Sequence, residues 1–170
     1  MDLPKPNYRK SYLLIALLVL AFDQFTKWLI VRNLELHSSV SVIPGLFQIT
    51  HVQNEGAAFG LFADSQSQWR IGGLILFSVI ALLVVSILLW RNGHKFTYGG
   101  VALALILGGA LGNLWDRVFQ GRVTDFLDFY VGNAHWPAFN IADSAIVIGA
   151  TLLVAEILFF SPPEEAKPAK

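Results

Sequence analysis

Residues 71–90 read IGGLILFSVIALLVVSILLW, a run of 20 residues without a charged side chain. A hydrocarbon core of about 30 Å needs roughly 20 apolar residues in α-helical conformation to cross it. This run therefore has the length and composition of one transmembrane helix. It decides the fold class, because a helix that is apolar on all its faces is typical of a membrane span or of the core of a large protein.

Three further segments have a similar length and apolar character. We expect four transmembrane helices in all, at about residues 11–31, 71–90, 98–117 and 138–160. The first of them is too long for a cleaved signal peptide and has no small-x-small cleavage site after its core, so we expect it to be retained.

The composition of the whole chain agrees with a membrane protein. Of its 170 residues, 55% are hydrophobic and 14% charged, whereas a soluble domain has about 45–50% apolar and about 25% charged residues. Twelve Lys and Arg balance twelve Asp and Glu, so no net charge would recruit nucleic acid. The absence of Cys rules out disulfides, thiolate nucleophiles and Cys-ligated metals. We expect a single integral membrane domain over residues 1–170.

Lys and Arg residues near the ends of the spans predict the orientation in the membrane. With a cytoplasmic N-terminus, seven of them flank the cytoplasmic side and four the outer side. The cytoplasmic group is Lys5, Arg9, Lys10, Arg91, Lys95, Lys167 and Lys170, and the outer group is Arg32, Arg70, Arg117 and Arg122. We therefore expect both termini in the cytoplasm.

The outer segment between the first two spans predicts a small β-sheet. Residues 38–43 and 46–52 alternate polar and apolar side chains on either side of Pro44-Gly45, a pattern typical of a β-hairpin. With the Gly- and Ala-rich turn that follows, the β segment covers about residues 34–60. The tail at about 161–170 is expected to be disordered. The predicted fold is an all-α membrane protein with four transmembrane helices and a small extracytoplasmic β-sheet on the outer surface.

Ionisable side chains inside the spans are candidates for function, because each costs at least about 2–3 kcal/mol to insert. Asp23 and Lys27 stand four residues apart on one helix face and can satisfy each other, which favours a structural or orienting role. Glu156 lies about four turns from Asp143, towards the cytoplasmic end. There it can reach the lipid headgroups, so it needs no function.

A second group of polar residues gathers at the outer ends of the last two spans. Asn113 and Arg117 share a face of the third span, and Asn140 and Asp143 share a face of the fourth. A short outer connection would make these spans antiparallel neighbours. Asp125, which lies in that connection, can then meet Asp143 at a similar membrane depth.

Two other carboxylates lie near this cluster. Asp128 follows Asp125 by three residues, so a single helical turn could bring either of them towards Asp143. Asp116 stands next to Arg117, and ion pairing between those neighbours is the simpler explanation for it.

Two carboxylates in a low-dielectric setting suit an aspartyl protease, in which one deprotonates water and the other, as an acid, polarises the scissile carbonyl. The sequence has no His-Glu-x-x-His and no Gly-x-Ser-x-Gly, so it gives no support to zinc or serine chemistry. The four His residues appear isolated in the sequence. The Gly-x-x-x-Gly at residues 108–112 most simply indicates close helix packing.

Five sequence blocks, in order, resemble those of the lipoprotein signal peptidases, the type II signal peptidases of bacteria. The blocks are Asp23-Gln24-Phe25-Thr26-Lys27, Asn54-Glu55-Gly56-Ala57-Ala58-Phe59, Gly108 to Arg117, Val123-Thr124-Asp125-Phe126, and Phe139-Asn140-Ile141-Ala142-Asp143-Ser144. The resemblance covers about residues 12–160.

This resemblance implies a membrane aspartyl endopeptidase that removes signal peptides from prolipoproteins, cleaving before a cysteine that carries a diacylglyceryl group. Asp125 and Asp143 would be the catalytic dyad. The supporting polar residues would be Asp23, Lys27, Asn54, Gly56, Asn113, Arg117 and Asn140. The enzyme would lie in the bacterial inner membrane with its active site near the periplasmic face. It would contact membrane lipids, be inhibited by globomycin, and need no metal or cofactor.

Two other classes of protein remain as alternatives. A proton- or ion-coupled small membrane carrier would also place Asp, Asn and Arg within its spans, although four spans without an inverted repeat argue against it. A non-enzymatic scaffold would have no need of Asp125 and Asp143.

Overall fold

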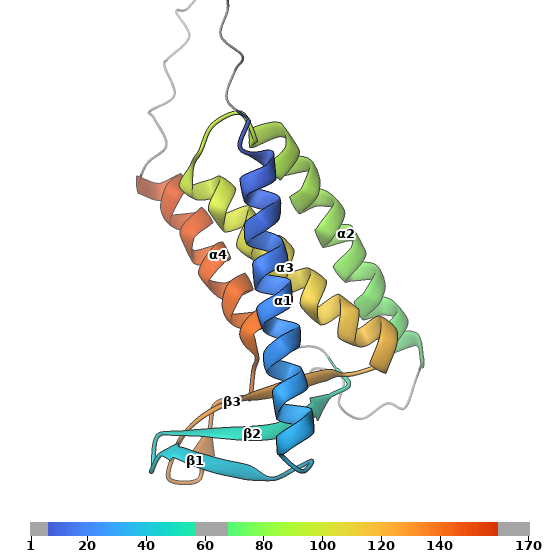
Figure 1. Ribbon diagram of the computed structural model, residues 1–170, viewed down its shortest axis with the longest axis vertical. Coiled ribbons are helices and arrows are strands. Elements are labelled where there is room, and N and C mark those ends of the chain that lie inside the picture. The colour runs from blue at the N-terminus through green and yellow to red at the C-terminus, as the bar shows by residue number, and fades with distance from the viewer. Residues whose placement is uncertain (1–6, 57–67, 160–170) are drawn as a thin grey trace, which may run out of the picture.

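The computed structural model describes residues 7–56 and 68–159, a helical bundle with a β-sheet at one end (Figure 1). The helices are α1 (Arg9–Asn33), α2 (Gln68–Asn92), α3 (Tyr98–Gln120) and α4 (Ile141–Phe159). All four are long and apolar enough to cross a membrane, which confirms the expected fold class of four membrane-spanning helices with a small sheet. The predicted tail at 161–170 and the end of the predicted turn, residues 57–60, lie outside the described residues.

Helix α3 forms the centre of the bundle and packs against the other three helices. Small residues make this possible. A Cβ atom added at Gly108 would lie 2.6 Å from the carbonyl oxygen of Ala16 on α1, and one at Gly112 would lie 2.5 Å from the Asp23 carboxylate. The predicted close packing at residues 108–112 is therefore confirmed, and it brings the buried polar residues of α1 against α3.

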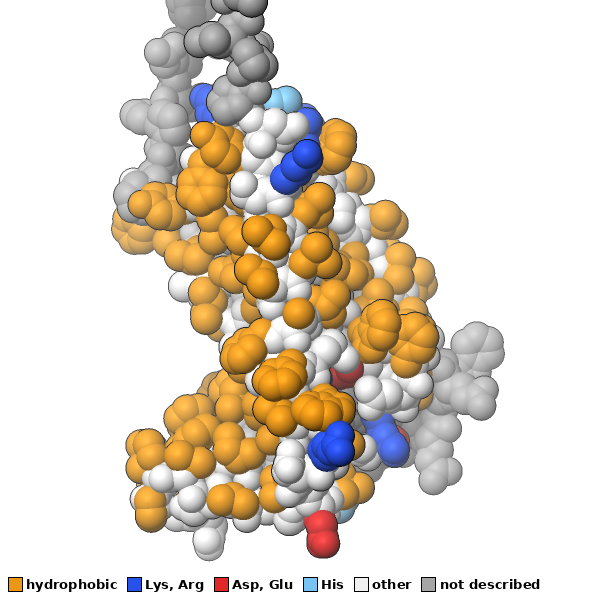
Figure 2. Space-filling model, viewed as in Figure 1, with side chains coloured by type: hydrophobic (Ala, Val, Ile, Leu, Met, Phe, Trp, Pro, Cys, Tyr) orange, Lys and Arg blue, Asp and Glu red, His pale blue; other side chains and the backbone are white. Residues whose placement is uncertain are grey.

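The outer surfaces of the helices are apolar. Side chains such as Leu17, Phe77 and Ile157 are more than half exposed, and α2 is exposed along most of its length. Hydrophobic side chains cover most of the bundle face seen in Figure 2, with Lys and Arg near its ends. Such a surface is stable in lipid, where it meets acyl chains rather than water.

The sheet is antiparallel and lies across the end of the bundle opposite the beginning of α1 and the end of α4 (Figure 1). Its strands, in spatial order, are β1 (Ser39–Ile43), β2 (Phe47–Asn54), β3 (Val123–Val131) and β4 (Ala134–His135). The predicted hairpin is thus confirmed as β1 and β2. The strand β3, which the sequence analysis did not predict, joins α3 to the hairpin.

The suggestion that one helical turn could bring either Asp125 or Asp128 towards Asp143 is therefore wrong. Both residues lie on β3, where positions three apart face opposite sides of the strand. The strand was missed because most of its first six residues are buried, which leaves no alternation of polar and apolar positions. Its content of Val, Thr, Phe and Tyr was the available signal.

Candidate active site

The predicted site residues come together at the end of the bundle that carries the sheet. They belong to α1, α3, the end of β2, the start of β3 and the start of α4. Two local features set this arrangement. Gly121 ends α3 with a φ of +71°, a left-handed conformation that suits glycine and turns the chain into β3. Asn140 caps α4, because its Oδ1 accepts the Asp143 backbone N–H at 2.9 Å. These two turns place Asp125 and Asp143 on either side of Asn140.

Asp125 is held by amides from two directions. Its Oδ1 accepts a hydrogen bond from Asn140 Nδ2 at 2.7 Å, and its Oδ2 accepts one from Asn54 Nδ2 at 3.2 Å. The Oδ1 of Asn54 in turn accepts the Gly56 backbone N–H at 2.9 Å. Both carboxylate oxygens of Asp125 therefore have hydrogen-bond partners. The residue is only 3% exposed.

Asp143 is held by the same network from the opposite side. Its Oδ1 accepts from Asn113 Nδ2 at 2.8 Å, and its Oδ2 lies 3.3 Å from the Asn140 backbone nitrogen, which donates to it. The Asn140 side chain also donates to Asn113 Oδ1 at 3.2 Å. Asn140 thus binds both carboxylates, and it couples their positions.

Burial, and after it the negative charge of Asp143, raise the pKa of Asp125 to about 7. Hydrogen bonds from Asn54 and Asn140 act against this, because they favour the ionised carboxylate. Near neutral pH, Asp125 is therefore divided between its protonated and ionised forms. Such a carboxyl group can act as an acid or as a base.

Arg117 lies on the same part of α3 as Asn113. Its Nη1 donates to the Asn113 carbonyl oxygen at 3.3 Å, which confirms that the two residues share a face. The charges of Asp143 and Asp125 both act on its guanidinium. The positive charge of Arg117 therefore lies within electrostatic range of both carboxylates.

Lys27 is the centre of a second group of buried polar side chains, which Asn113 joins to the carboxylate pair. Its ammonium lies 2.8 Å from Asp23 Oδ2 and 2.7 Å from Asp116 Oδ2, and it donates to Asn113 Oδ1 at 3.1 Å. All three charged side chains are at most 5% exposed. The expected pair of Asp23 and Lys27 is confirmed, but Lys27 also serves two residues of α3.

The structure corrects the interpretation of Asp116. Its ion pair is with Lys27 rather than with the adjacent Arg117, because successive residues of a helix point in different directions. Gln24 Nε2 completes the cluster by donating to Asp116 Oδ1 at 2.9 Å. Sequence reasoning gave no role to Gln24. Its place beside Asp23 in a membrane span was the signal that could have found it.

Asp23 also acts on α4. Its Oδ1 accepts the backbone N–H of Ala142 at 2.9 Å, one of the donors that the first turn of a helix leaves without a partner. Asp23 therefore connects α1 to the turn of α4 that carries Asp143.

Asp128 belongs to a different cluster. It accepts a hydrogen bond from Gln48 Nε2 at 2.6 Å and contacts His135 Nδ1 at 2.9 Å, so it joins β3 to its neighbouring strands. His135 is thus not isolated, as it appeared in the sequence. Within residues 7–56 and 68–159, no three His, Cys, Asp or Glu residues are grouped so that they could hold a metal ion.

The raised pKa of Asp125 predicts a pH-dependent stability. A carboxyl group whose pKa rises on folding binds its proton more tightly in the folded state, so stability falls as the pH rises from about 4 to about 7. The shift from 3.8 to about 7 corresponds to up to about 4 kcal/mol. We expect the unfolding temperature in detergent to fall more between about pH 5 and about pH 8.5 for the wild type than for Asp125→Asn. Equal pH dependence would contradict the shift.

Comparisons with known proteins agree with this arrangement. Residues 15–159 match the family described as "Signal peptidase (SPase) II". The chain is 43% identical over 153 residues to the lipoprotein signal peptidase of Solibacter usitatus (strain Ellin6076), covering 90% of this chain and 93% of that protein. It is 44% identical over 162 residues to the lipoprotein signal peptidase of Francisella tularensis subsp. novicida (strain U112), covering 94% and 97%.

The fold also matches two solved structures. One is described as "Bacterial membrane enzyme structure by the in meso method at 2.3 A resolution", with a TM-score of 0.81, 32% identity, and coverage of 98% of this chain and 100% of that chain. A second, similarly described, has a TM-score of 0.80, 33% identity, and coverage of 94% and 100%. The family match covers nearly all of the four membrane-spanning helices and all strands of the sheet. It identifies the chain as a multi-pass bacterial membrane protease, and the membrane carrier is no longer needed as an alternative. The chain belongs to the signal peptidase II family.

Proposed function

We propose that the chain is an aspartic endopeptidase that removes signal peptides from prolipoproteins, with Asp125 and Asp143 as a dyad that shares one proton. The observation that carries this proposal is the position of Asn140, which binds both carboxylates and so holds them as a pair. Two adjacent carboxylates cannot both ionise cheaply, and a shared proton gives one base and one acid at the same time.

The dyad would act on a water molecule and a peptide carbonyl. The ionised carboxylate removes a proton from water, which attacks the carbonyl carbon, while the protonated carboxyl donates a hydrogen bond to the carbonyl oxygen. When the tetrahedral intermediate collapses, the C–N bond breaks and a proton passes from the dyad to the leaving amine. Asn113 and Asn140 orient the two carboxylates, and Arg117 balances their charge.

A lipid-modified substrate suits the position of this site. The dyad lies where the bundle meets the sheet, beside apolar surface that faces the membrane. The outline in Figure 2 is hollowed between the lower part of the bundle and the sheet. Apolar side chains of the sheet, including Val40, Val42 and Phe129, are exposed. We infer that the sheet rests on the membrane surface and helps to hold the peptide. In this proposal the enzyme cleaves the peptide bond before the cysteine that carries the diacylglyceryl group.

The lipid group is expected to be required for efficient cleavage. We expect a prolipoprotein peptide with a diacylglyceryl cysteine to be cleaved at least about a hundredfold faster than the same peptide without it, because binding of the lipid helps to position the scissile bond. The measurement is kcat/KM for both peptides in detergent, with globomycin expected to inhibit. Equal values would exclude lipid recognition but leave the protease assignment intact.

We propose that the enzyme lies in the inner membrane with both termini in the cytoplasm and the dyad near the periplasmic face. The chain has no Cys, so single cysteines can report its orientation. Ser39 lies on β1, at the sheet end, and Asn92 at the end of α2 on the opposite side of the bundle. On intact spheroplasts, a membrane-impermeant maleimide is expected to label Ser39→Cys and not Asn92→Cys. The reverse pattern would invert the topology.

A further inference from the structure

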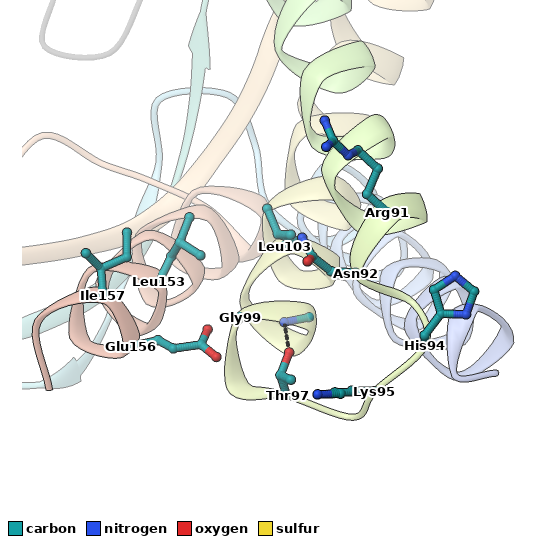
Figure 3. A pocket seen from close by; sticks show the side chains of 11 residues that line it. Arg91, Asn92, His94, Lys95, Thr97, Gly99, Leu103, Leu153, Glu156 and Ile157 are labelled. Atoms are coloured by element: carbon teal, nitrogen blue, oxygen red, sulfur yellow. Dashed lines mark hydrogen bonds between the residues drawn. The ribbon is translucent and has the colours of Figure 1, made fainter. Parts of the chain in front are cut away.

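Figure 3 shows a pocket of about 560 Å³. Its lining residues belong to the end of the bundle opposite the carboxylate pair. It is formed by the end of α2, the connection to α3, the first turns of α3 and the last turns of α4. Its lining side chains include Arg91 from the last turn of α2, His94 and Lys95 from the connection, and Leu103, Leu153 and Ile157 from α3 and α4. The pocket therefore combines a cationic part with an apolar part.

The charge at this end of the bundle is mainly positive. Among the described residues there, the cations are Arg9, Lys10, Arg91 and Lys95, and the carboxylate is Glu156. Glu156 points towards the first turn of α3, near Thr97 and Gly99 (Figure 3). It packs so closely on Gly99 that a Cβ atom there would collide with it. The Glu156 side chain therefore packs against α3 as part of the pocket wall.

The end of α2 and the connection to α3, which carry Arg91 and Lys95, are held in place by α1. The hydroxyl of Tyr12 donates to the Lys95 carbonyl oxygen at 2.8 Å and accepts the Thr97 backbone N–H at 2.9 Å. Arg9 Nε donates to the Trp90 carbonyl oxygen at 3.0 Å. Because these contacts fix the backbone on both sides of Arg91 and Lys95, the pocket is preformed.

The position of the pocket at the end of the membrane-spanning helices indicates which kind of ligand it can bind. The spans end here, so the Lys and Arg side chains lie at the depth of the lipid headgroups. The apolar wall continues onto the lipid-facing side of α4, where Ile157 is 62% exposed. A free anion would leave that wall uncovered, whereas a phospholipid supplies both a phosphate and an acyl chain.

We propose that this pocket binds the headgroup of an anionic membrane phospholipid. Its phosphodiester lies against Arg91 and Lys95, and the start of one acyl chain lies against Leu103, Leu153 and Ile157. This site is separate from the dyad, and it does not depend on the reaction proposed there.

The test is native mass spectrometry of the full chain released from detergent micelles, with phosphatidylglycerol as the probe. We expect one phosphatidylglycerol to be retained per chain, more tightly than phosphatidylcholine. Since each Lys or Arg that lies against an anionic headgroup contributes roughly fivefold to lipid binding, Arg91→Gln/Lys95→Gln is expected to bind about twenty-five-fold more weakly. Lys10→Gln is the matched control, because it removes an exposed cation at the same end outside the pocket lining and should bind like the wild type.

Several results would overturn the proposal. These are equal retention of the two lipids, unchanged binding in the double variant, an equal loss in Lys10→Gln, or displacement of the lipid by millimolar inorganic phosphate, which would identify a free-anion site. If thermal unfolding shows that the double variant is not folded, the single variant Lys95→Gln serves instead, with an expected loss of about fivefold.

Discussion

Asp125→Asn and Asp143→Asn are each expected to abolish cleavage of a lipidated prolipoprotein peptide, with kcat reduced by at least about 10³-fold. Asn keeps the size and shape of Asp but can neither accept the proton from water nor donate a carboxylic acid proton. General acid–base catalysis by one positioned group contributes about 10²–10⁴-fold, and each carboxylate of the dyad serves in both directions. The measurement is single-turnover cleavage in detergent micelles.

The double variant is expected to be little worse than either single variant, because the two carboxylates act as one unit. Asp128→Asn is the matched control. Asp128 lies on the same strand and is similarly buried, but its partners are Gln48 and His135. It should keep substantial activity. Loss of activity in Asp128→Asn together with an active Asp125→Asn would show that the dyad is assigned to the wrong strand position.

Lys27→Met is expected to destabilise the protein by about 3–5 kcal/mol, because it leaves buried Asp23 and Asp116 without their cation. Met matches the length of the Lys stem, so the packing is largely kept. Activity should also fall, since Lys27 donates to Asn113, which in turn holds Asp143. The measurement is thermal unfolding in detergent, with cleavage followed at a temperature where the variant is folded.

Lys10→Met is the control for Lys27→Met, because Lys10 is an exposed lysine on the same helix. It should change stability by less than about 0.5 kcal/mol. A second variant, Lys27→Met/Asp116→Asn, removes one of the stranded carboxylates and is expected to recover part of the lost stability. If Lys27→Met unfolds at the wild-type temperature, the three-residue cluster does not hold α1 to α3.

Local sequence determined much of this protein. A transmembrane helix satisfies its backbone hydrogen bonds within itself, so each span could be recognised from its own apolar residues. The hairpin of β1 and β2 showed in the alternation on either side of Pro44-Gly45, because adjacent strands need only a turn to pair. The candidate site residues were visible as polar groups in apolar segments, where each costs free energy unless it has a partner. Their roles as a catalytic dyad and its supports remain a prediction.

Tertiary structure decided how those residues are paired. Asp116 turned out to bind Lys27 on another helix, and Asn140 turned out to join Asp125 to Asp143, because side-chain direction and helix packing choose among several possible partners. The strand β3 and the pocket at the far end of the bundle were also set by contacts between segments distant in sequence. Composition and spacing describe one segment at a time, whereas these features exist only once the small residues of α3 let α1 and α4 pack closely against it.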